Sequence, residues 1–356
     1  MNAETSNANL VFVTSKPAAG GAEKSLVSIA ELFAEKGNQV HLLFLSPGGP
    51  LSLSHSVRSI FLADAELVRF SFFKKLILAY KLRRYVNKIK GAVVVSTLPV
   101  ADEVVALSGC SPTIFRIANL YGVDVDAQTN VLKRAKRLNR YKYLYGNRKL
   151  VCTTSFMAEH MRDAFDSKDI TIIHNFVNNS LEMAVPDPLL KADYCIHIGR
   201  FVPQKRHVFL LEVWAMFPTL PDLVLLTQPN EFLERVIESL NLRGRVKVVS
   251  YVQNPMPLIG GSKCLVLCSK YEGFPSVIIE AMQAQVRIAT GSCGGVADEI
   301  CSDIPEVICD DSSADAFGKA LVRILDSPTP DYHLALSRFS KSRAIDLWSD
   351  LIRPLK

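Results

Sequence analysis

Short apolar runs alternate along the chain with longer segments whose apolar residues recur at helical spacing. Residues 10–14 and 39–45 are apolar runs of the kind found in strands buried on both faces. Between them, residues 22–36 carry apolar side chains three or four positions apart, at Leu26, Ile29, Ala30 and Phe33. This strand–helix–strand order predicts a doubly wound parallel sheet, whose ligand lies at the carboxyl ends of the strands.

The same alternation continues to the end of the chain. Further strands are predicted at residues 92–96, 113–117, 151–155 and 170–174, and then at 194–198, 223–226, 246–251, 264–268 and 286–290. Helices are predicted at residues 313–326 and 331–352, and the segment 180–191, which contains two prolines, is predicted to be a linker. A chain of 356 residues is long enough for two domains, which we place at 1–179 and 192–337.

Charge is distributed unevenly between the two halves. Residues 1–175 contain 23 Lys and Arg against 14 Asp and Glu, whereas residues 176–356 contain 18 against 21. The segment 70–90 has seven basic and no acidic residues, and 133–149 has eight and none. In the first segment the apolar side chains fall mostly on one side, at Phe73, Leu76, Ile77, Tyr80 and Leu82. A basic amphipathic helix is typical of proteins that contact anionic membranes.

The basic segments have two alternative interpretations, which stay open. Solvated helices whose apolar sides pack on a sheet give the same pattern. The basic side chains could also bind a nucleic acid. The chain contains no recognisable nucleic-acid-binding motif, however, so no nucleic-acid partner is expected.

Several features point to a cytoplasmic protein. No run of 18 apolar residues is present, and the N-terminal stretch lacks the basic start and apolar core of a signal peptide. The eight cysteines are scattered without a C-x-x-C pair, which favours a reducing compartment and no metal site. Cys264 and Cys268 share one face of a predicted strand and are expected in the core.

Two carboxylates eight residues apart carry the clearest chemistry. Glu272 lies in a loop after the predicted strand 264–268, and Glu280 lies about one turn into a helix that begins near Pro275 or Ser276. The start of that helix offers unpaired N–H groups that suit a phosphate, and the carboxylates can accept hydrogen bonds from sugar hydroxyls. The stretch therefore favours a nucleotide-sugar site, although a helix with a capping glutamate is the simpler alternative.

Two other loops follow predicted strands. Gly20 and Gly21 follow the first strand without forming the dinucleotide pattern G-x-G-x-x-G, which disfavours a nicotinamide cofactor. Arg200 and Lys205 follow the strand 194–198. A guanidinium fork and a compact ammonium at a strand end suit a diphosphate.

These motifs together resemble the family 4 glycosyltransferases of the GT-B fold. The sequence E-G-F-P-x4-E from Glu272 to Glu280, followed by G-G-x3-E-I, is similar to the E-x7-E signature of these retaining enzymes. The G-G-A-E loop from Gly20 and the segment from Gly199 to Lys205 also resemble family elements. The resemblance implies two Rossmann-like domains facing across a cleft, with a last helix, about 338–356, that returns to the first domain.

The resemblance also implies roles for individual residues. Glu272 would bind the hydroxyls of the donor sugar, and Glu280 the ribose. Arg200 and Lys205 would neutralise the leaving diphosphate in place of a metal. Donor-binding backbone is expected at Gly20, Gly21, Val252, Gly273, Phe274, Pro275, Ser276 and Val277. Where many relatives have a histidine near the transferred sugar, Asn119 stands here, and Arg116 is the alternative contact.

The implied function is transfer of a hexose, expected from a UDP-sugar, to a glycan or a lipid-linked saccharide with retention of configuration. No cofactor or metal is implied. The expected setting is lipopolysaccharide or capsule biosynthesis, with peripheral contact at the inner face of the cytoplasmic membrane. The alternatives are a nucleotide-sugar epimerase or hydrolase of the same fold, an inactive GT-B binding module, and a nucleic-acid-binding protein.

Overall fold

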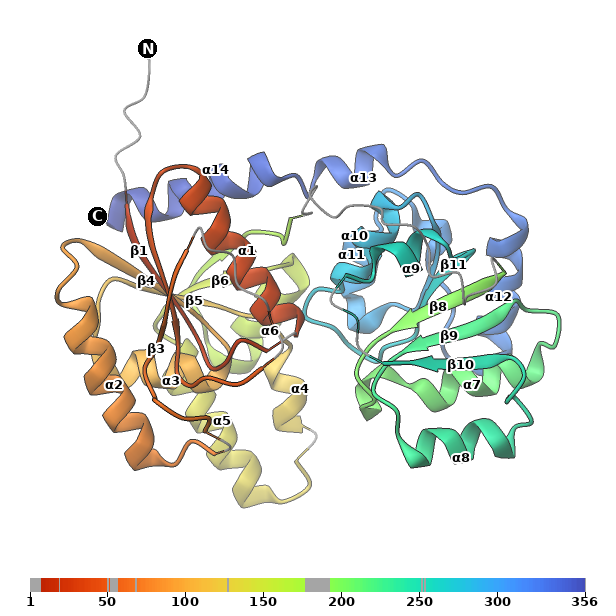
Figure 1. The fold of residues 1–356 in the computed structure, drawn as a ribbon, viewed down its shortest axis with the longest axis horizontal. Coiled ribbons are helices and arrows are strands. Elements are labelled where there is room, and N and C mark those ends of the chain that lie inside the picture. Colours follow the sequence, from red (N-terminus) through yellow and green to blue (C-terminus); the bar gives the residue numbers. More distant parts are fainter. Residues whose placement is uncertain are drawn as a thin grey trace, which may run out of the picture. The chain divides into compact units, whose positions relative to one another are not determined.

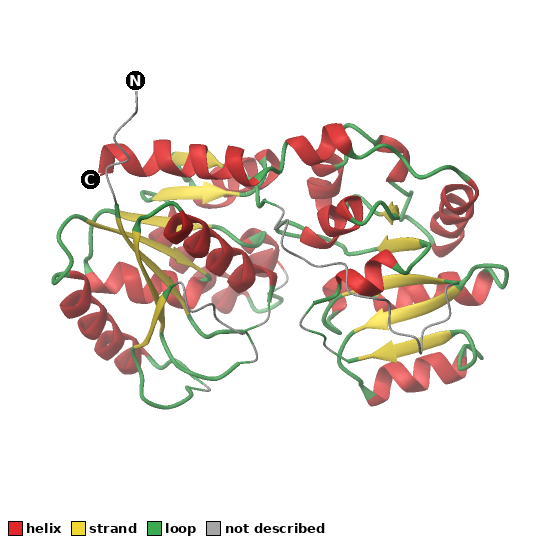
Figure 2. Cartoon of the chain, turned by 45° about the horizontal axis from the view of Figure 1, so that its top comes forward, coloured by secondary structure: helices red, strands yellow, loops and turns green. Residues whose placement is uncertain are grey.

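The chain forms two compact units, residues 1–175 with 341–356 and residues 176–340. The structure, a computed structural model, describes residues 8–355 except 19, 50, 52–56, 68, 127, 177–192, 251 and 253. The predicted linker and the predicted domain limits at 179 and 192 therefore lie outside the described residues. Helices flank the sheet of each unit (Figure 2).

The first unit is built on a seven-stranded sheet in the order β3-β2-β1-β4-β5-β6-β7 (Figure 1). Its strands are β1 Asn9–Thr14, β2 Gln39–Phe44, β3 Arg58–Phe61, β4 Ala92–Thr97, β5 Thr113–Arg116, β6 Lys149–Cys152 and β7 Asp169–Ile172. Every pairing in this sheet is parallel. The central strands β1 and β4 are buried along nearly their whole length, which explains their continuous apolar sequences.

Helices connect these strands and cover the sheet. They are α1 Gly21–Glu35, α2 Phe72–Val86, α3 Pro99–Ser108, α4 Tyr121–Asp126, α5 Val131–Tyr145 and α6 Ser155–Phe165. The C-terminal helix α14, Lys341–Ile352, belongs to this unit, and its Lys341 Nζ lies 3.3 Å from Glu35 Oε2 at the end of α1. A short 3-10 helix, Arg353–Leu355, follows α14.

The second unit has a five-stranded parallel sheet in the order β10-β9-β8-β11-β12. The strands are β8 Tyr194–Ile198, β9 Asp222–Leu226, β10 Val246–Val249, β11 Cys264–Leu267 and β12 Arg287–Thr290. The helices are α7 His207–Met216, α8 Glu231–Ser239, α9 Met256–Gly260, α10 Ser276–Gln283, α11 Val296–Ile300, α12 Ala314–Asp326 and α13 His333–Ser337. Short 3-10 helices occupy η1 Pro203–Lys205, η2 Cys293–Gly295 and η3 Pro305–Val307. Cys264 and Cys268 are buried in the core, as predicted.

The doubly wound parallel sheets are confirmed, but the predicted helix 331–352 is wrong. It is two helices, α13 and α14, with a break that contains Arg338 and Phe339. Phe339 is buried and its ring lies 5.9 Å from that of Phe274, while Arg338 donates to Asp303 and to the carbonyl of Glu299. These contacts with residues remote in sequence explain the break, which the apolar spacing of the segment does not show. Among the described residues, no helix combines the length and apolar character needed to cross a membrane.

Candidate functional site

Three loops meet at the carboxyl ends of the strands in the second unit. They follow β8, β11 and β12. Gln204, in the first loop, donates from its side-chain Nε2 to the backbone carbonyl of Tyr271 at 2.7 Å. Its backbone carbonyl accepts from the Lys270 N–H at 2.9 Å. In the other direction, the Glu272 N–H donates to the carbonyl of Cys293 at 3.1 Å. Backbone hydrogen bonds therefore hold the loop of Glu272 between its two neighbours.

An ion pair joins two of the predicted site residues at this edge. Lys205 Nζ donates to Glu272 Oε1 at 2.5 Å, although 67 positions separate the two residues. The lysine and glutamate side chains are only 18% and 10% exposed. Because an ammonium group has three N–H donors, Lys205 can keep this bond and still donate to another anion.

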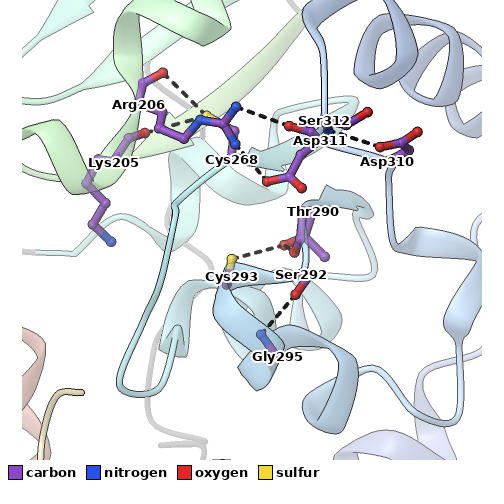
Figure 3. A network of polar contacts seen from close by, with 11 residues as sticks. Lys205, Arg206, Cys268, Thr290, Ser292, Cys293, Gly295, Asp310, Asp311 and Ser312 are labelled. Atoms are coloured by element: carbon purple, nitrogen blue, oxygen red, sulfur yellow. Dashed lines mark hydrogen bonds and ion pairs between the residues drawn. The ribbon is translucent and has the colours of Figure 1, made fainter. Parts of the chain in front are cut away.

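The next residue, Arg206, has a different environment. Its guanidinium donates to Asp311 Oδ2 at 2.7 Å and to the Asp311 carbonyl at 3.1 Å, and it lies 3.8 Å above the centre of the Phe209 ring. Figure 3 shows the Arg206 side chain directed at Asp311, whereas the Lys205 side chain points away from this contact. Arg206 has a φ of 52°, and its contacts fix the loop in this left-handed conformation. Sequence reasoning did not select Arg206, because its partner is remote in sequence.

Gly294 and Gly295 are the two glycines of the G-G-x3-E-I stretch, and Gly294 packs against the loop of Glu272. A Cβ at Gly294 would lie 3.1 Å from Tyr271 Cβ, and the φ of Gly294 is 75°. Both the close approach and the backbone conformation favour glycine. The Gly295 N–H donates to Ser292 Oγ at 2.9 Å (Figure 3), which closes this turn.

The predicted helix after Glu272 is present as α10, which begins at Ser276. Pro275 occupies the position before it and provides no side-chain cap. The Ser276 N–H donates to the carbonyl of Phe274 at 2.9 Å and the Ile278 N–H to the carbonyl of Pro275 at 3.0 Å, so backbone carbonyls satisfy part of this helix start beside the loop of Glu272. The buried side chains of α10 are Ile278, Ile279, Ala281 and Met282. Glu280 lies about one turn into the helix and is half-buried.

The remaining donor-side residues lie at the same edge of the sheet. Arg200 is exposed just after β8, and Val252 is half-buried just after β10. Gly273 is buried, and Phe274 and Val277 are half-buried. No hydrogen bond or ion pair that we find among the described residues connects Arg200 or Val252 to Lys205 or Glu272. The structure therefore brings together Lys205, Glu272 and the start of α10, and leaves Arg200 and Val252 at its margin.

Two histidines lie directly behind the loop of Lys205. His197 donates from Nδ1 to the carbonyl of Val266 at 2.9 Å, and its ring stands nearly perpendicular to that of His207 at 4.8 Å between centroids. Burial lowers the pKa of His207 to about 4 and holds that of His197 well below its usual range, with the nearby Lys205 ammonium acting in the same direction. Both rings are therefore neutral at neutral pH. Among the described residues, no three His, Cys, Asp or Glu side chains gather in a way that could hold a metal ion.

In the first unit, the structure separates the roles of Arg116 and Asn119. Arg116 is 2% exposed, and its Nη2 donates to Asn175 Oδ1 at 2.6 Å and to Ser25 Oγ at 2.7 Å. Burial lowers the pKa of Arg116 to about 10, so it stays charged at neutral pH. Asn119 is half-buried and accepts at Oδ1 from the Leu120 N–H at 2.9 Å. Arg116 thus connects the end of β5 to Ser25 on α1 and to Asn175 inside the first unit. Asn119 stays the predicted contact for the transferred sugar.

The glycine loop of the first unit also has two distinct positions. A Cβ at Gly20 would lie 2.5 Å from Glu23 Oε2, so the carboxylate of Glu23 lies close over this glycine. At Gly21, no described heavy atom comes within 4 Å of such a Cβ. The space beside Gly21 therefore leaves room for a ligand to approach the backbone.

The two halves of the chain match two models of glycosyltransferase families. Residues 19–181 match Glycosyltransferase Family 4, and residues 183–343 match Glycosyl transferases group 1. The chain belongs to the family 4 glycosyltransferases. The predicted family is thereby confirmed, because the two matches together extend from the first loop into the first turn of α14.

Relatives and solved structures agree with this assignment. The glycosyltransferase is 22% identical to an N-acetyl-alpha-D-glucosaminyl L-malate synthase of Bacillus anthracis, covering 82% of this chain and 80% of that one. It is 23% identical to the lipopolysaccharide core biosynthesis glycosyltransferase LpsE of Rhizobium meliloti, covering 94% and 96%. The crystal structure of HepE of Anabaena in complex with UDP and glucose superimposes with a TM-score of 0.78 at 15% identity, covering 98% and 100%. The predicted GT-B fold, with two Rossmann-like domains, is confirmed.

Proposed function

We propose that this glycosyltransferase moves a hexose from a UDP-sugar to a glycan or lipid-linked saccharide, with retention of configuration and without a metal. The observation that carries the proposal is the Lys205–Glu272 pair at the carboxyl edge of the second sheet, beside the uncapped start of α10. A cation and the positive end of a helix suit the diphosphate of the donor, and a carboxylate suits its sugar hydroxyls.

The charge arrangement supports departure of the diphosphate. When the bond between the anomeric carbon and the β-phosphate oxygen breaks, negative charge develops on the leaving group. Lys205, held by Glu272, and the exposed Arg200 would neutralise that charge. The acceptor hydroxyl would bond to the anomeric carbon on the face that the phosphate leaves, and its proton would pass to the departing phosphate oxygen. No protein base is required in this scheme.

The choice of donor and acceptor rests on similar proteins. HepE, which shares the fold, is described with UDP and glucose bound. LpsE is named for lipopolysaccharide core biosynthesis, which supports a saccharide acceptor in a bacterial surface polymer. The Bacillus anthracis relative is named for transfer to malate, so a small hydroxy acid is the second candidate acceptor. The cytoplasmic location inferred from the cysteines stays a prediction.

The experiment is an assay of UDP release from a panel of UDP-hexoses, with and without saccharide acceptors and with L-malate as a separate arm. Acceptor-dependent release, unchanged by a metal chelator, is the expected result, and NMR of the product should show the anomeric configuration of the donor. Release or epimerisation without any acceptor would instead identify a hydrolase or epimerase. Inversion of configuration would contradict the proposed reaction.

A further inference from the structure

The helix α2 has two apolar faces rather than one. Its inward face consists of Leu78, Ala79, Leu82 and Val86, all buried. Besides Phe72 at the first position, which is 59% exposed, four other apolar side chains are between 39% and 77% exposed: Phe73, Leu76, Ile77 and Tyr80. The spacing of these four, by three, one and three residues, places them on one stripe, opposite the buried face, because an α-helix advances about 100° per residue. This outward stripe is therefore not needed for packing on the sheet.

Basic residues border the outward stripe. The helix α2 contains five basic residues and no acidic one. Lys74 and Lys81 lie along one side of the stripe and Arg83 along the other, and all three are exposed. The Arg84 guanidinium lies 5.8 Å from the centre of the Tyr80 ring. Apolar side chains flanked by cations are the pattern of a helix that lies in a membrane interface.

A single carboxylate connects α2 to a second basic helix. Glu103 Oε2, on α3, accepts from Lys75 Nζ of α2 at 2.8 Å and from Arg140 Nη2 of α5 at 2.6 Å. The helix α5 contains six basic residues and no acidic one, and its first two residues, Val131 and Leu132, are 78% and 81% exposed. The two helices are thus held beside α3 in one unit, and each carries exposed basic side chains.

The second unit offers no comparable surface among its described residues. Its exposed large apolar side chains are Met216, Phe232 and Leu334, on three different helices. Isolated exposed residues of this kind are ordinary, whereas a contiguous patch marks an interaction site.

We propose that α2 and α5 form a docking surface for a bilayer of anionic phospholipids, with Phe73 and Ile77 entering the headgroup region. We call this the α2–α5 surface. Its cations suit lipid phosphates, and each basic residue near an anionic leaflet strengthens binding. A nucleic acid would use the same cations but has no apolar interior to receive the stripe, so the exposed phenylalanine and isoleucine favour lipid. The inference goes beyond the proposed function, because docking can be measured without donor, acceptor or turnover.

The test is co-sedimentation of the full chain with vesicles, either of phosphatidylcholine alone or of phosphatidylglycerol and phosphatidylcholine in equal parts. Binding to the anionic vesicles should be at least about tenfold tighter than to the neutral ones, and should weaken as salt increases. The double variant Phe73→Ser/Ile77→Ser should weaken binding to the anionic vesicles by about tenfold or more. Lys74→Glu should weaken it by about tenfold.

Matched controls lie on the second unit. Leu334→Ser removes an apolar side chain that is 65% exposed, between Phe73 at 77% and Ile77 at 59%. Arg235→Glu changes the net charge by the same amount as Lys74→Glu. Both controls should bind like the unmodified chain, and all variants should keep its melting temperature, because every altered side chain is exposed. Equal binding to both kinds of vesicle, or equal losses in variants and controls, would overturn the proposal. So would tighter binding to duplex RNA or DNA that the same α2 variants abolish.

Discussion

Each unit places a cation at the carboxyl edge of its sheet, and the two cations have opposite surroundings. Arg116 ends β5 in the first unit, is 2% exposed, and donates to neutral oxygens of Ser25 and Asn175. Lys205 follows β8 in the second unit, is partly exposed, and pairs with the carboxylate of Glu272. A cation enclosed by its hydrogen-bond partners can only support structure. A cation at an accessible edge, with N–H groups to spare, can meet a ligand.

The comparison explains why residue type alone does not identify a site residue. An arginine is the better diphosphate ligand by its planar fork, yet here the buried arginine joins α1, β5 and the end of the first domain. The lysine is presented by a loop that two neighbouring loops hold in place. What distinguishes them is burial and the identity of the acceptor, which only the fold determines.

Replacing Arg116 tests the structural side of the comparison and has the largest expected effect. Arg116→Ala should lower the free energy of unfolding by about 4 kcal/mol, because it leaves a cavity and removes the charged donor from Ser25 Oγ and from the buried Asn175 Oδ1. Urea denaturation measures this. Arg69→Ala removes an exposed arginine of the same unit and should cost under about 0.5 kcal/mol. Equal losses in the two variants would contradict the assignment of Arg116.

Replacing Lys205 tests the functional side. Lys205→Ala should lower turnover about 100-fold, equivalent to roughly 3 kcal/mol of transition-state stabilisation. It should also lower stability, because it leaves the largely buried carboxylate of Glu272 without its cation, so kinetics are compared at a temperature at which both proteins are folded. Arg200→Ala should act in the same direction. Steady-state kinetics with the best UDP-hexose provides the measurement. Turnover within a few-fold of the unmodified enzyme would remove Lys205 from the diphosphate site.

The free energy of unfolding should depend on pH in opposite directions through one buried group in each unit. Burial lowers the pKa of His207 in the second unit from 6.5 to about 4, so the unfolded chain binds the extra proton and stability falls as pH drops through this window. Burial raises the pKa of Asp102 in the first unit from 3.8 to about 7, so the folded chain binds the extra proton and stability falls as pH rises through that range. Each slope should approach about 1.4 kcal/mol per pH unit.

Variants separate these two contributions. Relative to the unmodified chain, His207→Gln should gain stability as pH falls from about 6.5 to about 4, whereas Asp102→Asn should gain as pH rises from about 4 to about 7. Urea denaturation at several pH values across this range gives both differences. Slopes of the same sign in the two variants would refute the contrast between the units.

Replacing Glu272 has the smallest expected effect of these variants. It tests whether Glu272 contacts the donor or only positions Lys205. Glu272→Gln should bind UDP about fivefold more tightly, because the diphosphate no longer meets a carboxylate beside Lys205. Sugar transfer should nevertheless fall, since the amide is a weaker acceptor for the hydroxyls of the donor sugar. Calorimetry with UDP and kinetics with UDP-hexose measure the two effects. Weaker UDP binding would mean that Glu272 chiefly positions Lys205.

Local pattern predicted most of the fold. The strand at 194–198 has the predicted bounds, because a buried parallel strand is a continuous apolar run. The predicted strand 151–155 is instead Lys149–Cys152, since Thr153, Thr154 and Ser155 cap and begin α6 rather than extend the strand. Periodicity also could not show which of the two apolar faces of α2 meets the sheet, because both have helical spacing.

The sequence predicted individual residues of the candidate site, but not the contacts between them. Arg200, Lys205 and Glu272 were selected from loops that follow predicted strands. The bond between Lys205 and Glu272 spans 67 positions, and the support from Arg206 depends on Asp311, 105 positions further along. Contacts at such separations follow from the order of strands in the sheet, which one sequence does not determine.

The most direct test of the central claim, that the edge around Lys205 and Glu272 binds a nucleoside diphosphate, is a thermal-shift panel. UDP, GDP, ADP and CMP are each compared on the unmodified chain and on Lys205→Ala. A ligand at 100 times its Kd stabilises a protein by about 2.7 kcal/mol, which is readily detected. The account predicts a shift selective for UDP that Lys205→Ala loses. No shift with any nucleotide, or a UDP shift that Lys205→Ala keeps, would contradict it.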